Sequence, residues 1–131
     1  MILRNSPTLE DNDHSTTLLP EMITALLEKA LAGQDHGVRE HAAKQLGLRK
    51  EVTAIQPLIN LLDDENPEVQ RAAATAIGQL RNPQGMIPLI AHLMLADATT
   101  AQNTQTGLQM LTKEDHGSDA LQWYAWWKRR H

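Results

Sequence analysis

The sequence has no cysteine and no phenylalanine, and its aromatic residues are limited to three Trp and one Tyr in a chain of 131 residues. Without cysteine the chain has neither a disulfide framework nor a thiol nucleophile. No apolar run approaches the length of a membrane-spanning helix, so we expect no membrane contact. The apolar start, Met1–Arg4, is too short for a signal peptide, and a cytoplasmic location is therefore the default expectation.

The chain also lacks an excess of positive charge. Asp and Glu number 16 against 12 Lys and Arg, which gives a net charge of −4. No overall positive field draws such a chain to nucleic acid or to anionic lipid. We therefore expect no nucleic acid among its partners.

Residues that could carry catalysis or bind a metal ion fall into no spacing typical of such sites. His36 and His41 lie five apart, off a shared helical face, and His92 has no second ligand four residues away. The stretch Glu114–His116 holds acidic and basic groups with no nucleophile beside them. We predict no enzyme activity, no catalytic or metal site and no cofactor, and we interpret His92 as a partly buried, hydrogen-bonded residue.

What the sequence does contain is a pair of helical patterns within Asn66–Leu95. Asn66 is a good N-cap and Pro67 suits the first helical position. The inward face of the first predicted helix has apolar residues at helical spacing: Val69, Ala73, Ala76, Ile77 and Leu80. The second, about Gln84–Leu95, has the following residues inward: Met86, Leu89, Ile90 and Leu93.

This pattern repeats in both directions. Capping residues recur at steps of 31 residues, at Asp35, Asn66 and Asp97. The second helices follow the same step, with Pro57 and Pro88 in equivalent places. A fixed period built from helix pairs is typical of an α-solenoid, in which stacked pairs share one core. The predicted fold is all-α, with about three helical hairpins (repeats about 35–65, 66–96 and 97–129) after an N-terminal half-repeat, a helix at about 21–32.

Three segments carry a resemblance to the HEAT repeat family in its short bacterial form. They are GVREHAAKQLG, NPEVQRAAATAIGQL and the Ile-x-Pro-Leu-Ile of the second helices. The end of the chain resembles a recurrent terminus of such proteins, except that the pattern has glycine at Lys113 and an aromatic residue at His116. The resemblance implies a single HEAT-like α-solenoid domain over residues 18–131, with the second helices lining its concave side.

Outward positions of the second helices differ between repeats. They are polar in the first repeat, at Gln56 and Asn60, and apolar in the next, at Ile87, Ala91 and Met94. An exposed apolar strip between polar rows often marks a contact surface. The alternative is that an N-terminal segment or a neighbouring copy covers the strip.

The two ends of the sequence differ in character. Residues 1–17 have little periodicity and are predicted to form a flexible tail, with a docked tail as the alternative. The last predicted helix contains all the aromatic residues, and Trp123 and Trp127 share a face that suits a terminal cap. Trp126 falls off that face and is the aromatic residue to test for exposure. An aromatic platform beside Lys128–Arg130, for bases or phosphates, is the weaker interpretation.

Taken together, these features favour a non-enzymatic interaction or scaffold module that binds a protein partner along its second helices. The candidate contact residues are Gln56, Asn60, Ile87, Ala91, Met94 and Trp126. We expect a monomer or a weak homodimer. The resemblance raises one alternative, an accessory subunit of an enzyme such as a phycobilin-lyase-like HEAT protein.

Overall fold

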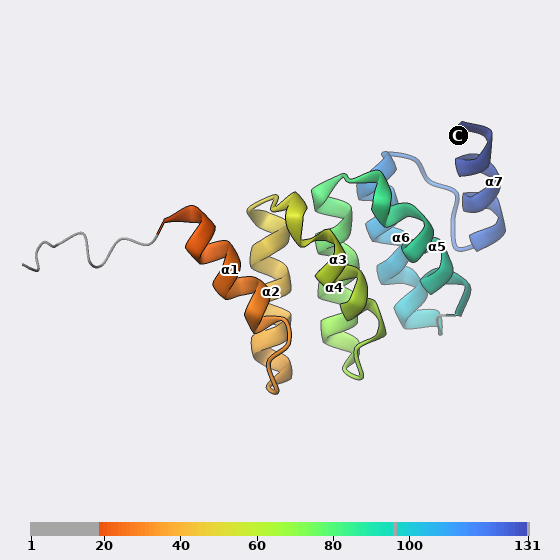
Figure 1. The fold of residues 1–131 in the computed structure, drawn as a ribbon. Coiled ribbons are helices and arrows are strands. Elements are labelled where there is room, and N and C mark those ends of the chain that lie inside the picture. The colour runs from red at the N-terminus through yellow and green to blue at the C-terminus, as the bar shows by residue number, and fades with distance from the viewer. Residues whose placement is uncertain (1–18, 96, 131) are drawn as a thin grey trace, which may run out of the picture.

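The computed structural model describes residues 19–95 and 97–130, and within these ranges it contains seven α-helices and no strand (Figure 1). The predicted tail, residues 1–17, lies outside the described residues. The helices are α1 (Pro20–Ala30), α2 (His36–Leu48), α3 (Ile55–Asn60), α4 (Pro67–Leu80), α5 (Met86–Leu95), α6 (Ala98–Thr112) and α7 (Ala120–Arg130). The fold is the all-α solenoid that the repeat pattern predicts.

Side-chain caps start the first helix of each repeat, as the 31-residue step predicts. Asp35 accepts a hydrogen bond from the backbone N–H of Gly37 at 2.7 Å. The Asn66 side chain accepts from Glu68 and Val69, and Asp97 accepts from Thr100 at 2.8 Å. Each cap satisfies N–H groups that the first helical turn leaves without a partner.

The second helices are shorter than predicted, because part of each is wound as 3₁₀-helix. The segment predicted as one helix, about 51–62, consists of α3 flanked by two 3₁₀ turns, Val52–Ala54 and Leu61–Asp63. Pro57 and Pro88 stand at the third position of α3 and α5. Because proline has no backbone N–H, it cannot donate to the carbonyl oxygen four residues earlier, and one α-helical hydrogen bond is lost before α3 and before α5.

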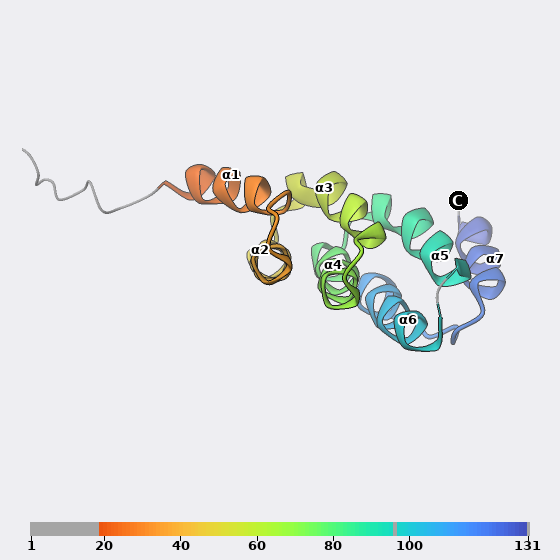
Figure 2. The same ribbon diagram turned by 90° about the horizontal axis from the view of Figure 1, so that it is seen from below.

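The helices form two layers, which Figure 2 shows edge on. We call α2, α4 and α6 the inner layer, and α1, α3, α5 and α7 the outer layer. The inner helices pack against one another more extensively than any other pairs, and the stack bends toward them (Figure 2). The second helices therefore lie on the convex side, and the expectation that they line the concave side is wrong.

Small residues explain this curvature. A Cβ atom added at Gly47 of α2 would come within 2.8 Å of the Ala76 Cα atom in α4. One added at Gly78 of α4 would lie 2.5 Å from the Gly107 carbonyl oxygen in α6. The inner helices thus meet backbone against backbone, while the outer helices carry larger side chains and remain further apart. A stack that is tight on one layer and wide on the other must bend toward the tight one.

The core lies between the layers. Its most deeply buried large side chains come from six helices: Leu46, Leu58, Val69, Ile77, Met86, Leu89, Leu108 and Trp123. The predicted inward face of α5 is confirmed, since Met86, Leu89, Ile90 and Leu93 are all buried. For α1, helical spacing predicts an inward face that includes Met22 and Leu26, and this prediction is wrong, since both side chains are exposed. The reason is that α1 packs mainly against α2, which covers only a narrow strip of it.

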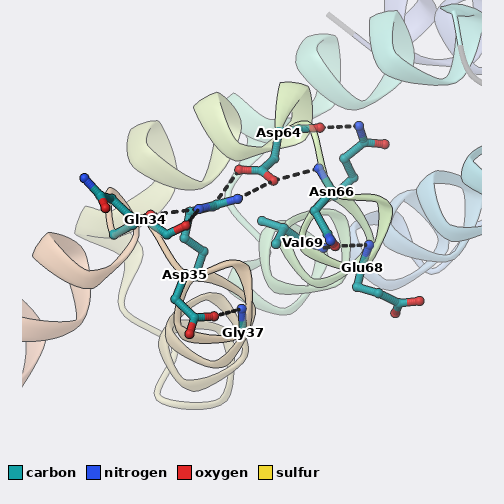
Figure 3. Close-up of polar contacts among 10 residues, drawn as sticks. Gln34, Asp35, Gly37, Asp64, Asn66, Glu68 and Val69 are labelled. Carbon is teal, nitrogen blue, oxygen red and sulfur yellow. Dashed lines mark hydrogen bonds and ion pairs between the residues drawn. The ribbon is translucent and has the colours of Figure 1, made fainter.

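A buried ion pair links the first two repeats at their loops (Figure 3). The Arg39 guanidinium donates to both carboxylate oxygens of Asp64, at 2.8 and 3.1 Å, and to the carbonyl oxygens of Gly33 and Gln34. Asp64 also accepts from the backbone N–H of Asn66 at 2.9 Å. Both charged side chains are 9% exposed. One guanidinium thereby fixes the loop before α2 to the loop before α4.

The pKa of each member of this pair shifts toward the charged form. The hydrogen bond to Asp64 raises the pKa of Arg39 above its usual value, against the opposing effect of burial. Burial alone would raise the pKa of Asp64, but the hydrogen bonds from Arg39 and Asn66 and the guanidinium charge together lower it. The pair is therefore fully ionised near neutral pH.

Candidate partner-binding surfaces

The outward side of α5 is the main apolar surface among the predicted contact residues. Ile87 is 48% exposed, Met94 59% and the adjoining Leu95 85%. Ala91 is exposed between them. We call these four residues the α5 surface. On α3, Gln56 and Asn60 are also exposed, as predicted, so the outer layer passes from a polar helix to an apolar one.

A hollow of about 550 Å³ separates α3 from α5. It is lined by residues of four helices and their connections: Ile59, Leu62, Asp63, Gln70, Pro88, Ala91, His92, Leu95, Asp97 and Thr100. Two residues of the α5 surface, Ala91 and Leu95, form part of its wall, whereas Gln56 and Asn60 do not. The lining combines aliphatic side chains with two carboxylates, Asp63 and Asp97. The chemistry suits an apolar group that carries positive charge nearby.

His92 lines this hollow and is partly buried and hydrogen-bonded, as predicted. Its Nδ1 atom lies 2.9 Å from the hydroxyl oxygen of Thr104, which is fully buried in α6. The Thr104 hydroxyl donates to the Thr100 carbonyl oxygen at 3.0 Å, so its only proton is already used. His92 must therefore donate from Nδ1, and the neutral ring carries its lone pair on Nε2. This contact explains why the polar helix α6 packs tightly on α5.

A second hollow, about 450 Å³, lies between α5 and the start of α7. Met94 and Leu93 line it from α5, and Ser118–Leu121 line it from the other side. Asp119 caps α7 by accepting from the backbone N–H of Leu121 at 2.9 Å. Leu121 is exposed, which extends the apolar area beyond Met94. The α5 surface is thus flanked by a hollow on each side.

Trp126 does not belong to this surface. It is half-buried in a cluster in which its ring centroid lies 5.4 Å from His116 and 6.4 Å from Trp123. The Arg130 guanidinium lies 4.7 Å above the same ring. Trp123 is fully buried and donates from Nε1 to the Gly117 carbonyl oxygen at 2.8 Å. The cluster ties the loop after α6 to α7, as expected of a cap, and the exposed ring of α7 is Tyr124 instead.

Within the Glu114–His116 stretch, Glu114 and His116 contact each other and Asp115 contacts the backbone. Glu114 lies 3.4 Å from His116, measured between Oε1 and Nε2. Asp115 accepts from the backbone N–H of Gly117 at 2.9 Å. That hydrogen bond, followed by those from the Gln109 and Gln105 amides, lowers the pKa of Asp115. The stretch is accounted for as a loop held by local hydrogen bonds.

Sequence reasoning missed three cations at the ends of the inner helices. Lys50, Arg81 and Lys113 have positive φ angles of 56°, 58° and 62° and line one hollow of about 340 Å³. A signal was present in the sequence, since Lys50 and Arg81 are one 31-residue step apart and Lys113 lies one residue beyond the next step. The 31-residue step thus extends from the apolar and capping residues to these cations.

Nowhere in residues 19–95 and 97–130 do three or more His, Asp or Glu side chains gather closely enough to hold a metal ion. In the same ranges, no helix has both the length and the apolar character that crossing a bilayer requires.

Comparison with known proteins gives two findings. A family model described as HEAT repeats matches residues 23–115. The bilin biosynthesis protein PecE of Mastigocladus laminosus is 39% identical over 71 residues, which cover 49% of this chain and 26% of PecE. The chain therefore spans only about a quarter of the length of that relative. The match to the repeat model, over most of the residues that form helices α1 to α6, identifies the chain as a member of the HEAT repeat family.

Proposed function

We propose that the protein is a non-enzymatic interaction module that binds a protein partner through the α5 surface. The observation that carries the proposal is the exposure of Ile87, Met94 and Leu95 on a helix flanked by two hollows. Apolar side chains gathered in this way gain free energy when a partner removes them from water. Membership of the HEAT repeat family supports a scaffold role of this kind.

The charges around the surface indicate the kind of partner. Asp63 and Asp97 line one hollow, Asp119 lines the other, and the whole chain has a net charge of −4. A segment with apolar side chains flanked by Lys or Arg complements this arrangement. A helix with one apolar face would place side chains in both hollows at once.

The test is site-resolved cross-linking in the native cell extract. A photoreactive residue at Met94 should capture the partner, and one at Val38, an exposed apolar position on α2, serves as the control. Ile87→Asp combined with Met94→Asp should then abolish capture while circular dichroism stays unchanged. Val38→Asp combined with Val52→Asp makes the same chemical change at exposed positions elsewhere and should leave capture intact. Equal capture by both double variants would reject the α5 surface.

A second candidate function is an accessory role beside an enzyme that handles bilins, as in a phycobilin-lyase-like HEAT protein. The observation that favours it is the 39% identity to a bilin biosynthesis protein. The hollow between α3 and α5 is a candidate site for a ligand, but its carboxylates would repel the propionates of a bilin. Titration with a free bilin should shift the bilin absorbance if this function holds, and Ala91→Trp should prevent the shift by filling the hollow. No shift with the unmodified chain would reject it.

We also propose that the chain is a monomer or a weak homodimer, because the α5 surface alone offers a small contact area. Light scattering across a concentration series measures this directly. A stable dimer that Met94→Asp dissociates would instead make a second copy the occupant of the α5 surface.

A further inference from the structure

The three inner helices end at the same edge of the stack (Figure 1). Each end is followed by a cation in an unusual backbone conformation. Lys50 follows α2, Arg81 follows α4 and Lys113 follows α6. Their φ angles of 56°, 58° and 62° lie in the left-handed region, where helices usually end with glycine because a Cβ atom is crowded there. Each of these positions, which glycine usually fills, holds a cation beside the negative end of a helix dipole.

These cations meet in one place. Lys50, Arg81 and Lys113 line a hollow of about 340 Å³ together with Gly78, Gln79 and Met110, and we call it the cationic hollow. The Lys50 Nζ atom donates to the Gln79 carbonyl oxygen at 3.5 Å. No carboxylate of residues 19–95 or 97–130 forms an ion pair with any of the three.

Nearby cations of the same helices behave differently. Arg39 pairs with Asp64, Arg49 with Glu51 and Arg71 with Glu68. The acidic residues that follow two of the three cations in sequence are also engaged elsewhere, Glu51 by Arg49 and Glu114 by His116. The cationic hollow therefore keeps positive charge that the protein does not neutralise, which attracts an anionic group.

A neighbouring hollow extends the site along the inner layer. It has a volume of about 230 Å³ and lies between α2 and α4, lined by Lys44, Leu48, Ala72, Thr75 and Gln79. Gln79 lines both hollows, so they adjoin. Leu48 is 63% exposed at its edge. The combined site thus has an exposed apolar side chain in the hollow between α2 and α4, and three cations in the adjoining hollow.

From this arrangement we propose that the inner layer binds an acidic segment of a partner protein. The segment lies across the ends of α2, α4 and α6, with an apolar side chain against Leu48 and carboxylates on Lys50, Arg81 and Lys113. Charge complementarity and the length of the two adjoining hollows favour an extended peptide over a compact anion. No aromatic side chain lines either hollow to stack on a base, and the net charge of −4 opposes a nucleic-acid backbone.

This site lies on the inner layer and shares no residue with the α5 surface. The proposal for the α5 surface and the proposal for the inner layer can therefore be tested independently. A loss of binding at one site with intact binding at the other identifies which of them is wrong.

The test uses glycine, because glycine keeps the backbone and removes the charge. The triple variant Lys50→Gly, Arg81→Gly and Lys113→Gly should melt no lower than the unmodified chain, since glycine adopts positive φ readily. The probe is a fluorescein-labelled peptide with leucine followed by a run of glutamates, measured by fluorescence anisotropy at low and at moderate salt. The triple variant should bind it at least about tenfold more weakly, because three charge-assisted contacts are lost. Binding to the unmodified chain should also weaken as salt rises.

The matched control removes the same number of positive charges elsewhere. Lys29→Gln, Lys128→Gln and Arg129→Gln change exposed residues near the ends of α1 and α7 and should keep most of the binding. If the glycine variant fails to fold, Lys50→Gln, Arg81→Gln and Lys113→Gln provide the same loss of charge with the original side-chain bulk. No peptide binding, an equal loss in the control, or tighter binding of a single-stranded oligonucleotide of equal charge would each overturn the proposal.

Discussion

The two layers of this solenoid come from one 31-residue repeat, yet they are held together in different ways. In the inner layer, Gly47, Gly78 and Gly107 let the helices touch backbone to backbone. In the outer layer, α3 and α5 leave a hollow between them, and α5 exposes Ile87, Met94 and Leu95. The comparison teaches that the inner layer sets the spacing and curvature of the stack. The outer layer does not set the spacing of the stack, so its exposed side chains are available for binding.

The largest effect should follow from forcing the inner helices apart. Gly78→Ala places a Cβ atom 2.5 Å from the Gly107 carbonyl oxygen, and backbone on both sides prevents an easy adjustment. Overpacking of this kind should lower the free energy of unfolding by about 3 kcal/mol. Urea denaturation measures the change. Gly37→Ala is the matched control, since that glycine is exposed in the first turn of α2 and should tolerate alanine with little loss.

An unchanged urea midpoint for Gly78→Ala would contradict the conclusion that the inner layer sets the spacing and curvature of the stack. It would mean that the spacing of α4 and α6 can relax at no cost. The curvature would then need a cause other than close contact between glycines.

The next largest effect concerns the ion pair that joins the loops of the first two repeats. Asp64→Asn leaves the buried Arg39 guanidinium without its counter-charge and should cost about 2 kcal/mol at neutral pH. Asp63→Asn alters the exposed neighbour and should cost little. Thermal melts of both variants, recorded by circular dichroism, separate a buried charge from a surface one.

The same pair predicts how stability depends on pH. The pKa of Asp64 in the folded chain lies below its ordinary value of 3.8, so the carboxylate stabilises the fold fully above about pH 4. That stabilisation should be lost as the pH falls through the lowered pKa. Asp64→Asn should flatten this part of the stability curve, whereas a curve identical to that of the unmodified chain would show that the pair does not contribute.

Much of the fold could be predicted from the sequence, because the signals for helix starts and for buried helix faces are local. Asp35, Asn66 and Asp97 cap helices where the repeat step places them, and the α5 core residues Met86 to Leu93 are buried as their spacing predicts. Gly47 and Gly78 are also one 31-residue step apart in the sequence. What they do to the stack depends on which neighbour each one meets.

The parts that could not be predicted depend on contacts between distant elements. The side of the bend follows from how closely Gly78 approaches Gly107 across two helices, and helical spacing within one segment says nothing about that distance. The burial of Trp126 depends on the loop that brings His116 beside it. The left-handed conformation of Lys50, Arg81 and Lys113 was hidden because lysine and arginine do not ordinarily signal it.

A smaller effect should come from the contact between the layers at His92. Thr104→Val keeps the shape of the buried side chain but leaves the Nδ1–H of His92 without its partner, at a cost of about 1 kcal/mol. Thr106→Val removes a hydroxyl that is bonded in the same way to its own helix but is exposed, so it should be nearly neutral. Urea denaturation of the two valine variants gives the difference. Equal costs would show that the hydroxyl matters only within α6 and that His92 does not couple the layers.

The smallest effect on stability should come from Met94→Ser on the outer layer, with Leu93→Ser at the adjacent position of α5 as its matched control. Leu93 is buried and Met94 is 59% exposed, although both are apolar in sequence. Leu93→Ser should lower the free energy of unfolding by about 3 kcal/mol through a cavity and a buried hydroxyl. Met94→Ser should change it by less than about 0.5 kcal/mol, as is usual for a surface position. A large loss at Met94 would mean that the chain itself covers the α5 surface in solution. A change near zero is the result expected of a side chain that has no part in the fold and is free to contact the proposed partner.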